Sequence, residues 1–309
     1  MDRVSTATLY SSLVGNLMTA QSNQVSAANQ VASGKVATDL QGFGSQAQTL
    51  TAMQTVQAQT QSFLDQGNAI SAKLTSQDTA FTQISNSMND ASSAISSALA
   101  TGSGSNIMQS LETAFQGVVA GLNTTFNGQY IFSGGQVNSP ATSATSLASL
   151  TSAPSVGSLF NNDQYVASNQ ISQNSTIQTG FLASNVGTAA YNAFQSIESY
   201  VQTNGPFTSP LTTAQTSFLQ STLSTFQSAA QGVTTVQAQN GLLQTEVTNT
   251  QTDLTDQSTT MQSLIGNITD ADMAKASTNL QQAQLALQAS AKVIASLQSD
   301  SLVTLLPVH

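Results

Sequence analysis

The chain has 309 residues, of which only 6% are charged, against roughly a quarter in an average globular protein. Five basic and 14 acidic residues give a net charge of -9, so the chain lacks the cationic patch with which proteins bind nucleic acid. Cysteine is absent, which excludes disulfides, thiol chemistry and cysteine-ligated metal sites.

The N-terminal segment predicts a helix with a narrow apolar stripe that ends at Ser33-Gly34. The stripe consists of Leu9, Leu13, Leu17, Val25 and Val31. The segment lacks the basic flank and continuous apolar core of a secretory signal, so we expect any export to use a route without a cleaved signal peptide. No run along the chain approaches the roughly 18 apolar residues of a membrane span, and we expect no membrane insertion.

A heptad pattern then predicts a long helix over residues 46–100, because apolar residues recur every seven positions along two lines three positions apart. At roughly 1.5 Å per residue this helix would be about 80 Å long. Residues 219–264 repeat the pattern, and two helices of matching length favour an antiparallel pair. Asn240 occupies a seam position, where a buried polar residue fixes the register of a coiled coil. The expected rod core is Phe63, Ile70, Leu74, Phe81, Ile84, Phe226, Val233, Leu243 and Leu254.

Two shorter helices are expected between these long ones. The first follows the turn at Gly102-Ser103-Gly104 and carries an apolar stripe from Ile107 to Phe126. The second carries a stripe from Ala190 to Val201 and ends at Gly205-Pro206, which are helix-breaking residues.

Residues 128–186 lose the heptad pattern and become rich in Gly, Ser, Asn, Thr and Pro. Short apolar pieces separated by turn residues predict strands, so we expect a small β-rich insertion. Its first piece, GQYIFSGGQ at 128–136, is expected to form a hairpin that includes Tyr130, Phe132 and Gly134. The aromatic side chains are expected to brace the helices; a ligand-stacking platform is the alternative.

A C-terminal helix completes the pattern, with a stripe of Leu280, Leu287, Ile294 and Leu297. Thr269, with Asp272 three residues later, resembles a capping box at the start of this helix. Both terminal helices carry small and amide residues on their other faces, so each should be marginally stable alone in water.

No catalytic, cofactor-binding or metal site is predicted. The single histidine, His309, is the last residue, which favours a solvated tail over a ligand or a base. Asp270 and Asp272 form a candidate carboxylate pair, but their place before a helix start favours a capping role. The sequence contains no His/Asp/Glu cluster with metal-ligand spacing and no phosphate-binding glycine loop. We therefore expect no cofactor and no enzyme activity.

Three segments carry a family resemblance. VASGKVATDLQGFG at 31–44 resembles the Ser-Gly segment that follows the first helix of bacterial flagellins and of the hook–filament junction protein. The segment from Asn267 to Leu306 resembles the family's C-terminal segment, with its Asp-x-Asp cap, Gln/Ala-rich helix and leucine ending. GQYIFSGGQ is similar to a Tyr-Ile-Phe-Ser-Gly stretch of the junction protein, the third hook-associated protein.

This resemblance implies an axial component of the extracellular bacterial flagellum that polymerises with itself and contacts other axial proteins, such as hook-associated proteins. It implies export through the flagellar type III apparatus with an export chaperone. The terminal helices would pair into the inner wall of the polymer, and weak helices of this kind would order when neighbours bury their stripes. Self-assembly would then use Leu9, Leu13, Leu17, Val25, Leu280, Leu287, Ile294 and Leu297.

The expected fold is mainly α: a long antiparallel coiled-coil helical rod with paired terminal helices and a small β-rich central insertion. The resemblance implies three parts. Residues 1–45 with 266–309 would form the inner polymer core, residues 46–127 with 187–265 the helical rod, and residues 128–186 the hairpin and an outward-facing insertion.

Three functions are compatible with this sequence. The leading hypothesis is a filament-forming flagellin for motility. The hook–filament junction protein is the alternative, favoured by GQYIFSGGQ. A secreted coiled-coil adhesin that presents residues 128–186 is a more remote one, and it would not require both termini for assembly.

Overall fold

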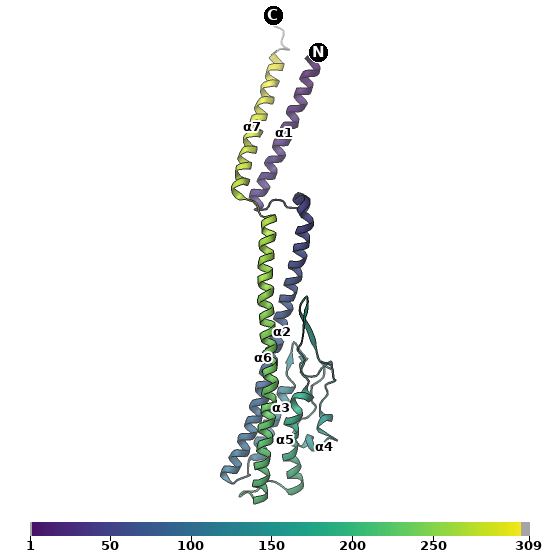
Figure 1. The fold of residues 1–309 in the computed structure, drawn as a ribbon, viewed down its shortest axis with the longest axis vertical. Helices are drawn as coiled ribbons and strands as arrows, with labels where there is room; N and C mark the ends of the chain where they lie inside the picture. The colour runs from purple at the N-terminus through teal and green to yellow at the C-terminus, as the bar shows by residue number, and fades with distance from the viewer. Residues whose placement is uncertain (1, 304–309) are drawn as a thin grey trace. The chain divides into compact units, whose positions relative to one another are not determined.

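The computed structural model describes the backbone of residues 2–303 and the side chains of residues 8 and 10–296 (Figure 1). Long helices dominate these residues, and the only sheets among them are two small antiparallel hairpins. The predicted fold class, mainly α with paired terminal helices and a small β-rich insertion, is confirmed. The major elements are α1 (Asp2–Ser33), the 3-10 helix η1 (Gln41–Gln46), α2 (Ala47–Thr101), α3 (Ile107–Leu122), α5 (Ala183–Asn204), α6 (Thr213–Thr269) and α7 (Met273–Val303).

The chain divides into two compact units. Residues 1–59 and 257–309 form one unit, which we call the terminal unit, and residues 60–256 form the other, which we call the central unit. The expected insertion at 128–186 does not stand apart as a unit of its own, because its apolar residues share a core with the helices of the central unit. The three-part division of an assembled polymer stays a prediction.

Within the central unit, α2 and α6 run antiparallel along a hydrogen-bonded seam. The Gln251 side chain donates to Asn68 Oδ1 at 2.8 Å, and the Asn240 side chain donates to the Leu74 carbonyl at 2.8 Å. Residue numbers therefore fall along α6 as they rise along α2. Of the expected core residues, Phe63 and Leu243 are half-buried. The others are buried: Ile70, Leu74, Phe81, Ile84, Phe226, Val233 and Leu254.

The seam includes two buried amide side chains. Asn240 reaches from α6 to the Leu74 carbonyl, and the Gln77 Nε2 donates to the Thr179 carbonyl at 3.0 Å. The amide oxygens of both side chains have no hydrogen-bond partner among the described residues. The Asn240–Leu74 hydrogen bond forms in only one alignment of α2 and α6, so it disfavours slipped pairings of the two helices.

Helix α3 approaches α2 closely because it turns two glycines towards it. A Cβ placed on Gly121 would lie 2.5 Å from Ile84 Cγ1, and one on Gly117 would meet the Ser87 hydroxyl. Real Cβ atoms do not come so near, so only glycine permits this spacing. The third helix thus enters the core at short range.

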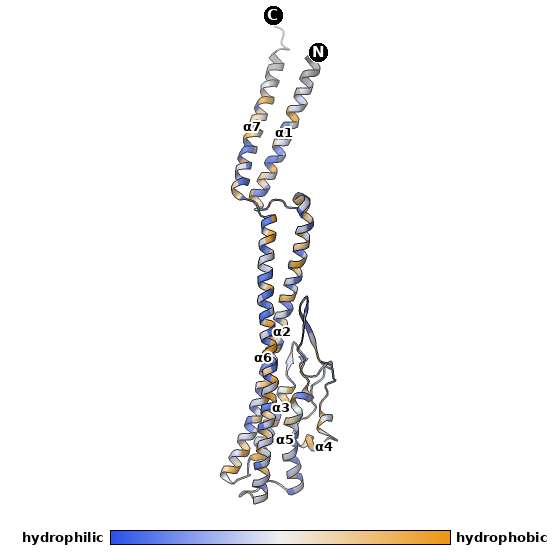
Figure 2. Cartoon of the chain, in the orientation of Figure 1, coloured by the Kyte–Doolittle hydropathy of each residue, from blue (hydrophilic) through white to orange (hydrophobic). Residues whose placement is uncertain are grey.

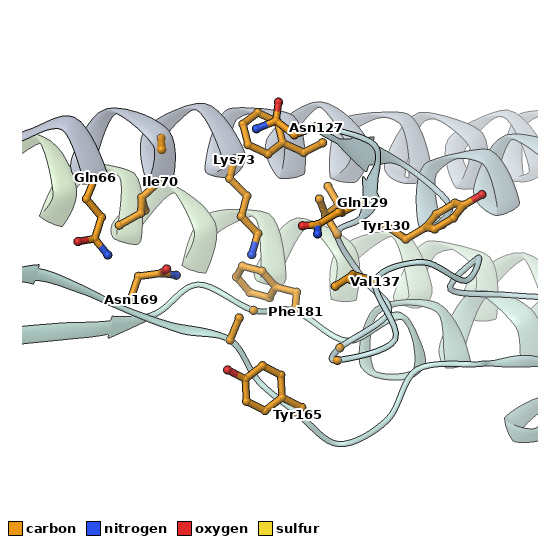
Figure 3. A pocket seen from close by; sticks show the side chains of 17 residues that line it. Gln66, Ile70, Lys73, Asn127, Gln129, Tyr130, Val137, Tyr165, Asn169 and Phe181 are labelled. Carbon is orange, nitrogen blue, oxygen red and sulfur yellow. The ribbon is translucent and has the colours of Figure 1, made fainter.

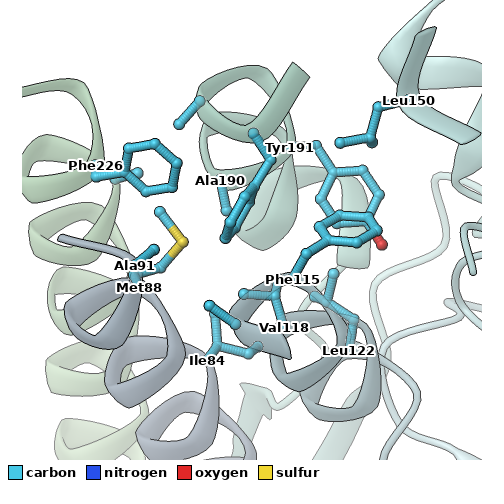
Figure 4. Close-up of a cluster of buried hydrophobic side chains, with 14 of the residues drawn as sticks. Ile84, Met88, Ala91, Phe115, Val118, Leu122, Leu150, Ala190, Tyr191 and Phe226 are labelled. Atoms are coloured by element: carbon cyan, nitrogen blue, oxygen red, sulfur yellow. The ribbon is translucent and has the colours of Figure 1, made fainter. Parts of the chain in front are cut away.

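Aromatic rings fill the space between α3, α5 and α6 (Figure 4). Phe115 lies with its ring centroid 5.1 Å from Tyr191 and 5.3 Å from Phe194. Phe194 in turn meets Phe226 edge to face at 4.8 Å. The buried Tyr191 hydroxyl donates to Thr142 Oγ1 at 2.9 Å, and burial raises the pKa of Tyr191. Such ring pairs stabilise the core beyond the area that they bury.

The insertion contains β1 (Thr125–Phe126), β2 (Gln129–Tyr130), α4 (Leu147–Ser152), the 3-10 helix η2 (Val156–Leu159), β3 (Ser168–Ser172) and β4 (Ser175–Gln178). The β3–β4 hairpin lies against the long helices. Its Ile171 and Ile177 are buried in a small cluster with Ile70, Leu74 and Val247. This hairpin therefore braces the α2–α6 pair.

The first hairpin is shorter than expected and lies slightly earlier in the chain. Its turn is Asn127-Gly128, with φ values of 50° and 77°, the conformation that an Asn-Gly turn adopts in tight hairpins. Of the three expected hairpin residues, only Tyr130 lies in a strand, β2. Phe132 and Gly134 follow it, in a loop that is closed where the Tyr130 N–H donates to the Val137 carbonyl at 2.9 Å. The placement of these two residues in the hairpin was wrong.

Candidate assembly surface

Helices α1 and α7 pair within the terminal unit, running side by side in opposite directions (Figure 1). Their seam is made of small residues. Ala20 and Ala27 of α1 and Ala276 and Ala283 of α7 are buried, and no larger apolar residue of the two helices is buried among those whose side chains are described. Because alanine lets helix backbones approach closely, this pair forms a tight contact that buries little apolar area.

The leucine stripes predicted for assembly lie beside this alanine seam. Leu13 and Leu17 of α1 and Leu280, Leu287 and Ile294 of α7 are half-buried. Val25 is 53% exposed. The side chains of Leu9 and Leu297 lie outside the described residues.

Larger apolar side chains point away from the seam on both helices. On α1, Met18 is 65% exposed, and Val25 follows it by seven residues on the same face. On α7, Leu285 is 69% exposed. Tyr10 and Val293 are also exposed. Figure 2 shows apolar positions recurring along both helices. We call Tyr10, Met18, Val25, Leu285 and Val293 the outer residues; the pair alone leaves them in water.

A groove of about 590 Å³ runs along the α1–α7 seam, and no charged residue lines it. Its walls carry amides and hydroxyls, such as Asn23 and Gln30 from α1 and Asn279 and Gln282 from α7. Neutral donors and acceptors can pair with another polar helix without the repulsion that like charges create. The low charge of the whole sequence thus has a structural counterpart here.

A short β-bridge joins the two helices at one end. The Val36 N–H donates to the Thr269 carbonyl at 2.8 Å, and the Ala271 N–H donates to the Gly34 carbonyl at 2.9 Å. Between these bonds the Lys35 Nζ lies 2.5 Å from Asp270 Oδ1. Gly34 has φ +69°, a left-handed conformation that glycine adopts without strain. We call these contacts the clasp.

Both aspartates of the predicted carboxylate pair have structural partners, and the expected capping box is wrong. Asp270 pairs with Lys35, and that pairing lowers the pKa of the Asp270 carboxyl, as does a hydrogen bond from Thr269. Asp272 is itself the cap of α7, since its Oδ1 accepts from the N–H groups of Ala274 at 3.0 Å and Lys275 at 3.1 Å. Thr269 ends α6 instead. A side-chain cap one residue before the helix replaces the Thr–Asp pattern.

The alternative of a ligand-stacking platform at Tyr130 and Phe132 does not match the geometry. Phe132 is fully buried, with its ring 5.3 Å from that of Phe81. Tyr130 lines a cleft of about 460 Å³ beside α2 (Figure 3). The two rings therefore do not present one shared surface.

Metal sites and membrane spans are not found in the described part of the chain. No group of His, Cys, Asp and Glu among the described residues could hold a metal ion. None of the helices that they form is long and apolar enough to cross a membrane. His309 lies outside the described residues.

The sequence patterns missed most of the outer residues and the alanine seam. A signal for them existed, because Met18 and Val25 are seven residues apart and Ala20 and Ala27 repeat the same interval on another face. Two apolar lines therefore run along α1. Size alone favours the larger side chains for the buried face of α1, but the structure buries the alanines, Ala20 and Ala27, against α7.

Known flagellar proteins resemble this chain in sequence and in fold. Residues 223–306 match the model of the bacterial flagellin C-terminal helical region. Two solved structures have the same fold. A protein assigned as a flagellar hook-associated protein from Vibrio parahaemolyticus has a TM-score of 0.60 and 13% identity, over 75% of this chain and 99% of that one. FlgL from Bacillus cereus has a TM-score of 0.54 and 12% identity, over 70% of this chain and 98% of that one.

No curated protein sequence matches the chain. The match over 223–306 nevertheless spans most of α6 and all of the described part of α7, the two helices that carry the C-terminal half of the clasp and of the alanine seam. The predicted resemblance at 267–306 is thus confirmed, whereas the segment at 31–44 lies outside the match. In its C-terminal part the chain is similar to the bacterial flagellin C-terminal helical region, and its fold is similar to that of a flagellar hook-associated protein and of FlgL.

Proposed function

We propose that the chain is a filament-forming flagellin that polymerises through α1 and α7 into the extracellular flagellar filament. The observation that carries this proposal is the α1–α7 pair. Its α7 helix lies in the region that matches the flagellin C-terminal model, and the pair leaves large apolar side chains on both helices exposed.

The physical reason for assembly is the mismatch between the seam and the outer residues. Full burial of a Met, Leu or Val side chain contributes roughly 1.5–3 kcal/mol, and Met18, Val25 and Leu285, each more than half exposed, gain only part of it within the chain. The alanine seam supplies little stability in compensation. Neighbouring copies that cover the outer residues would therefore stabilise the terminal helices while they hold the polymer together.

The proposal includes no enzymatic activity. It includes export through the flagellar type III apparatus, with a chaperone that covers the terminal helices before assembly, and no cleaved signal peptide. A chaperone is consistent with the exposed apolar residues, because such side chains on a soluble monomer favour unwanted association. Other axial proteins, including hook-associated proteins, would contact the ends of the polymer.

Deletion of residues 1–40 tests this function. The deletion removes α1 and Lys35, and with them the seam partner of α7 and the cation of the clasp. We expect the truncated protein to stay in the supernatant under conditions that sediment polymers of the full chain. Polymerisation of the truncated protein at the full-length level would exclude this role of α1 and would favour the adhesin.

A set of substitutions on another helix serves as the control. The quadruple variant replaces four exposed glutamines of α2 by alanine: Gln48→Ala, Gln54→Ala, Gln59→Ala and Gln61→Ala. These changes leave α1, α7 and the clasp intact, so the variant should sediment like the full chain. Loss of polymers in this variant would mean that the assay responds to changes outside the terminal helices.

The hook–filament junction protein is the second candidate. Both structural neighbours described above are named for hook-associated proteins or FlgL, and GQYIFSGGQ resembles the same kind of protein. A junction protein would form short, self-limited assemblies, whereas a filament protein forms long ones.

A further inference from the structure

A single cation stands out in the central unit. Lys73 is the only basic residue within 60–256. Nine acidic residues share that unit with it: Asp65, Asp78, Asp90, Glu112, Asp163, Glu198, Glu246, Asp253 and Asp256. Despite this excess, Lys73 forms no ion pair with any residue that the structure describes.

The Lys73 side chain enters the cleft beside the first hairpin. It extends from α2 towards the ring of Phe181 (Figure 3). The cleft measures about 460 Å³, and its apolar walls include Ile70, Phe126 and Phe181. Amides from Gln66 and Asn169 also line it. None of the 17 lining residues is acidic.

The surroundings of Lys73 make its charge costly within the monomer. Burial lowers the pKa of the ammonium group, because a partly apolar environment disfavours the charged form. A carboxylate placed in the cleft would offset that cost, and the neighbouring amides could donate to its second oxygen. Asp163 does not line the cleft, and its carboxylate already accepts from the N–H groups of two residues that do, Gly135 and Tyr165, each at 2.9 Å.

We propose that this cleft receives an Asp or Glu side chain of a neighbouring copy of the chain, whose carboxylate pairs with Lys73. This inference rests on the proposed function, since polymerisation supplies the neighbour. Charge complementarity favours a second copy as the occupant, because the one basic residue of the central unit lies in this cleft, whereas five of its acidic residues are exposed: Asp65, Asp90, Glu246, Asp253 and Asp256. When the cleft of one copy binds a different surface of the next copy, the contact is head-to-tail, and repeated contacts of this kind build helical polymers.

Zero-length cross-linking of mixed polymers tests the contact directly. Equal amounts of unlabelled and ¹⁵N-labelled chain are mixed as monomers, polymerised and treated with a carbodiimide, which joins a lysine only to a carboxylate that touches it. We expect cross-linked peptides that join Lys73 of one isotope to an acidic residue of the other. Lys35 and Asp270, 2.5 Å apart in one chain, are the internal control and should join peptides of the same isotope.

The outcomes separate this inference from the proposed function. Polymers that yield the Lys35–Asp270 product but no mixed-isotope product at Lys73 would overturn the inference and leave the filament role intact. If the wild-type chain forms no polymer at all, the filament role fails, and the inference that depends on it fails with it. A Lys73 product that contains one isotope only would place the acidic partner in the same chain, which also overturns the inference.

Substitutions give an independent readout. Lys73→Met keeps the aliphatic stem in the cleft and removes the charge, and we expect it to raise the critical concentration for polymerisation about tenfold, which is about 1.4 kcal/mol. Lys73→Arg keeps the charge, so its critical concentration should lie much closer to that of the wild-type chain than to that of Lys73→Met. Gln231→Glu lowers the net charge by the same unit at an exposed position of α6 and should leave the critical concentration unchanged. Equal effects of Lys73→Met and Gln231→Glu would mean that net charge, and no specific contact, is responsible.

Discussion

At the scale of single residues, the core of the central unit depends on a few large side chains. Phe81 and Phe226 are fully buried, and each has an aromatic neighbour: Phe81 meets Phe132 at 5.3 Å and Phe226 meets Phe194 at 4.8 Å. Their removal would leave cavities that a closely packed core cannot fully close. Leu242, by contrast, is 72% exposed on the same helix as Phe226, and its removal would leave no cavity.

Replacement of Phe81 or Phe226 by alanine should therefore lower the free energy of unfolding by about 3–5 kcal/mol. Chemical denaturation followed by circular dichroism measures the change. The control Leu242→Ala should change the free energy of unfolding by less than about 0.5 kcal/mol. A loss below about 1 kcal/mol at either phenylalanine would contradict the seam that buries them.

The clasp should weaken in acid because of Asp270. Lys35 lowers the pKa of Asp270 in the folded chain from its ordinary value of 3.8, so folding favours the ionised carboxylate. The resulting stabilisation is fully present above the ordinary pKa and is lost as the pH falls through the lower folded value. Asp270→Asn, which removes the charge, should abolish this dependence.

Amide hydrogen exchange measures the clasp, because the Val36 and Ala271 N–H groups donate within it. After correction for the intrinsic exchange rate, protection of both amides should fall below pH 3.8 in the wild-type chain and stay level in the Asp270→Asn variant. A fall of the same size in both proteins would assign the acid sensitivity to another group.

At the scale of elements, glycine positions separate close helix contacts from open ones. Gly121 of α3 faces Ile84, with an added Cβ only 2.5 Å from Ile84 Cγ1 and 3.2 Å from the Ala80 carbonyl oxygen. Gly232 of α6 has nothing within 4 Å of the same position. The same substitution should thus have opposite effects at the two sites.

Gly121→Ala should lower the free energy of unfolding, because overpacking that costs about 1–3 kcal/mol exceeds the helix gain of about 0.5–1 kcal/mol from replacing glycine. Gly232→Ala should raise it by about 0.5–1 kcal/mol, since only the helix gain applies. Thermal and denaturant unfolding of the two variants measures both changes. Stabilisation by Gly121→Ala would mean that α3 lies farther from α2 than the structure places it.

The elements differ in how far the sequence could predict them. The heptads of α2 and α6 reveal long helices, because a buried seam imposes a repeat that persists over many turns. The first hairpin is marked by Asn127-Gly128, the turn signal that lies one residue before the aromatic stretch. The aromatic residues led the prediction to place the hairpin too late in the chain. Phe132 packs against Phe81 in the core and does not belong to a strand.

The candidate sites were harder to predict because long-range contacts define them. Lys35 and Asp270 are 235 positions apart, and no local pattern brings them together. The cleft at Lys73 combines α2, the first hairpin and the segment around Phe181, and an isolated lysine in a heptad reads as an exposed position. Only the apolar stripe of α1 gave a local signal. Even there, the sequence of α1 alone could not show whether its leucines or its alanines pack against α7.

At the scale of the whole molecule, the two units have different chemical characters. The central unit buries large aromatic side chains such as Phe81, Phe115 and Phe194 in one core, as a protein stable by itself does. The terminal unit pairs its helices through alanines and leaves Met18, Val25 and Leu285 exposed, as expected of a surface that further copies cover in a polymer. Assembly is thus expected to change the order of α1 and α7 far more than that of the central unit.

The proposed filament role is tested most directly by electron microscopy of the purified full-length protein under assembly conditions. A filament-forming flagellin predicts long helical filaments, with α1 and α7 of many copies in their inner wall and the outer residues covered. Particles that stay monomeric, or that stop at short caps, would contradict the filament role, and the short caps would assign the chain to the hook–filament junction.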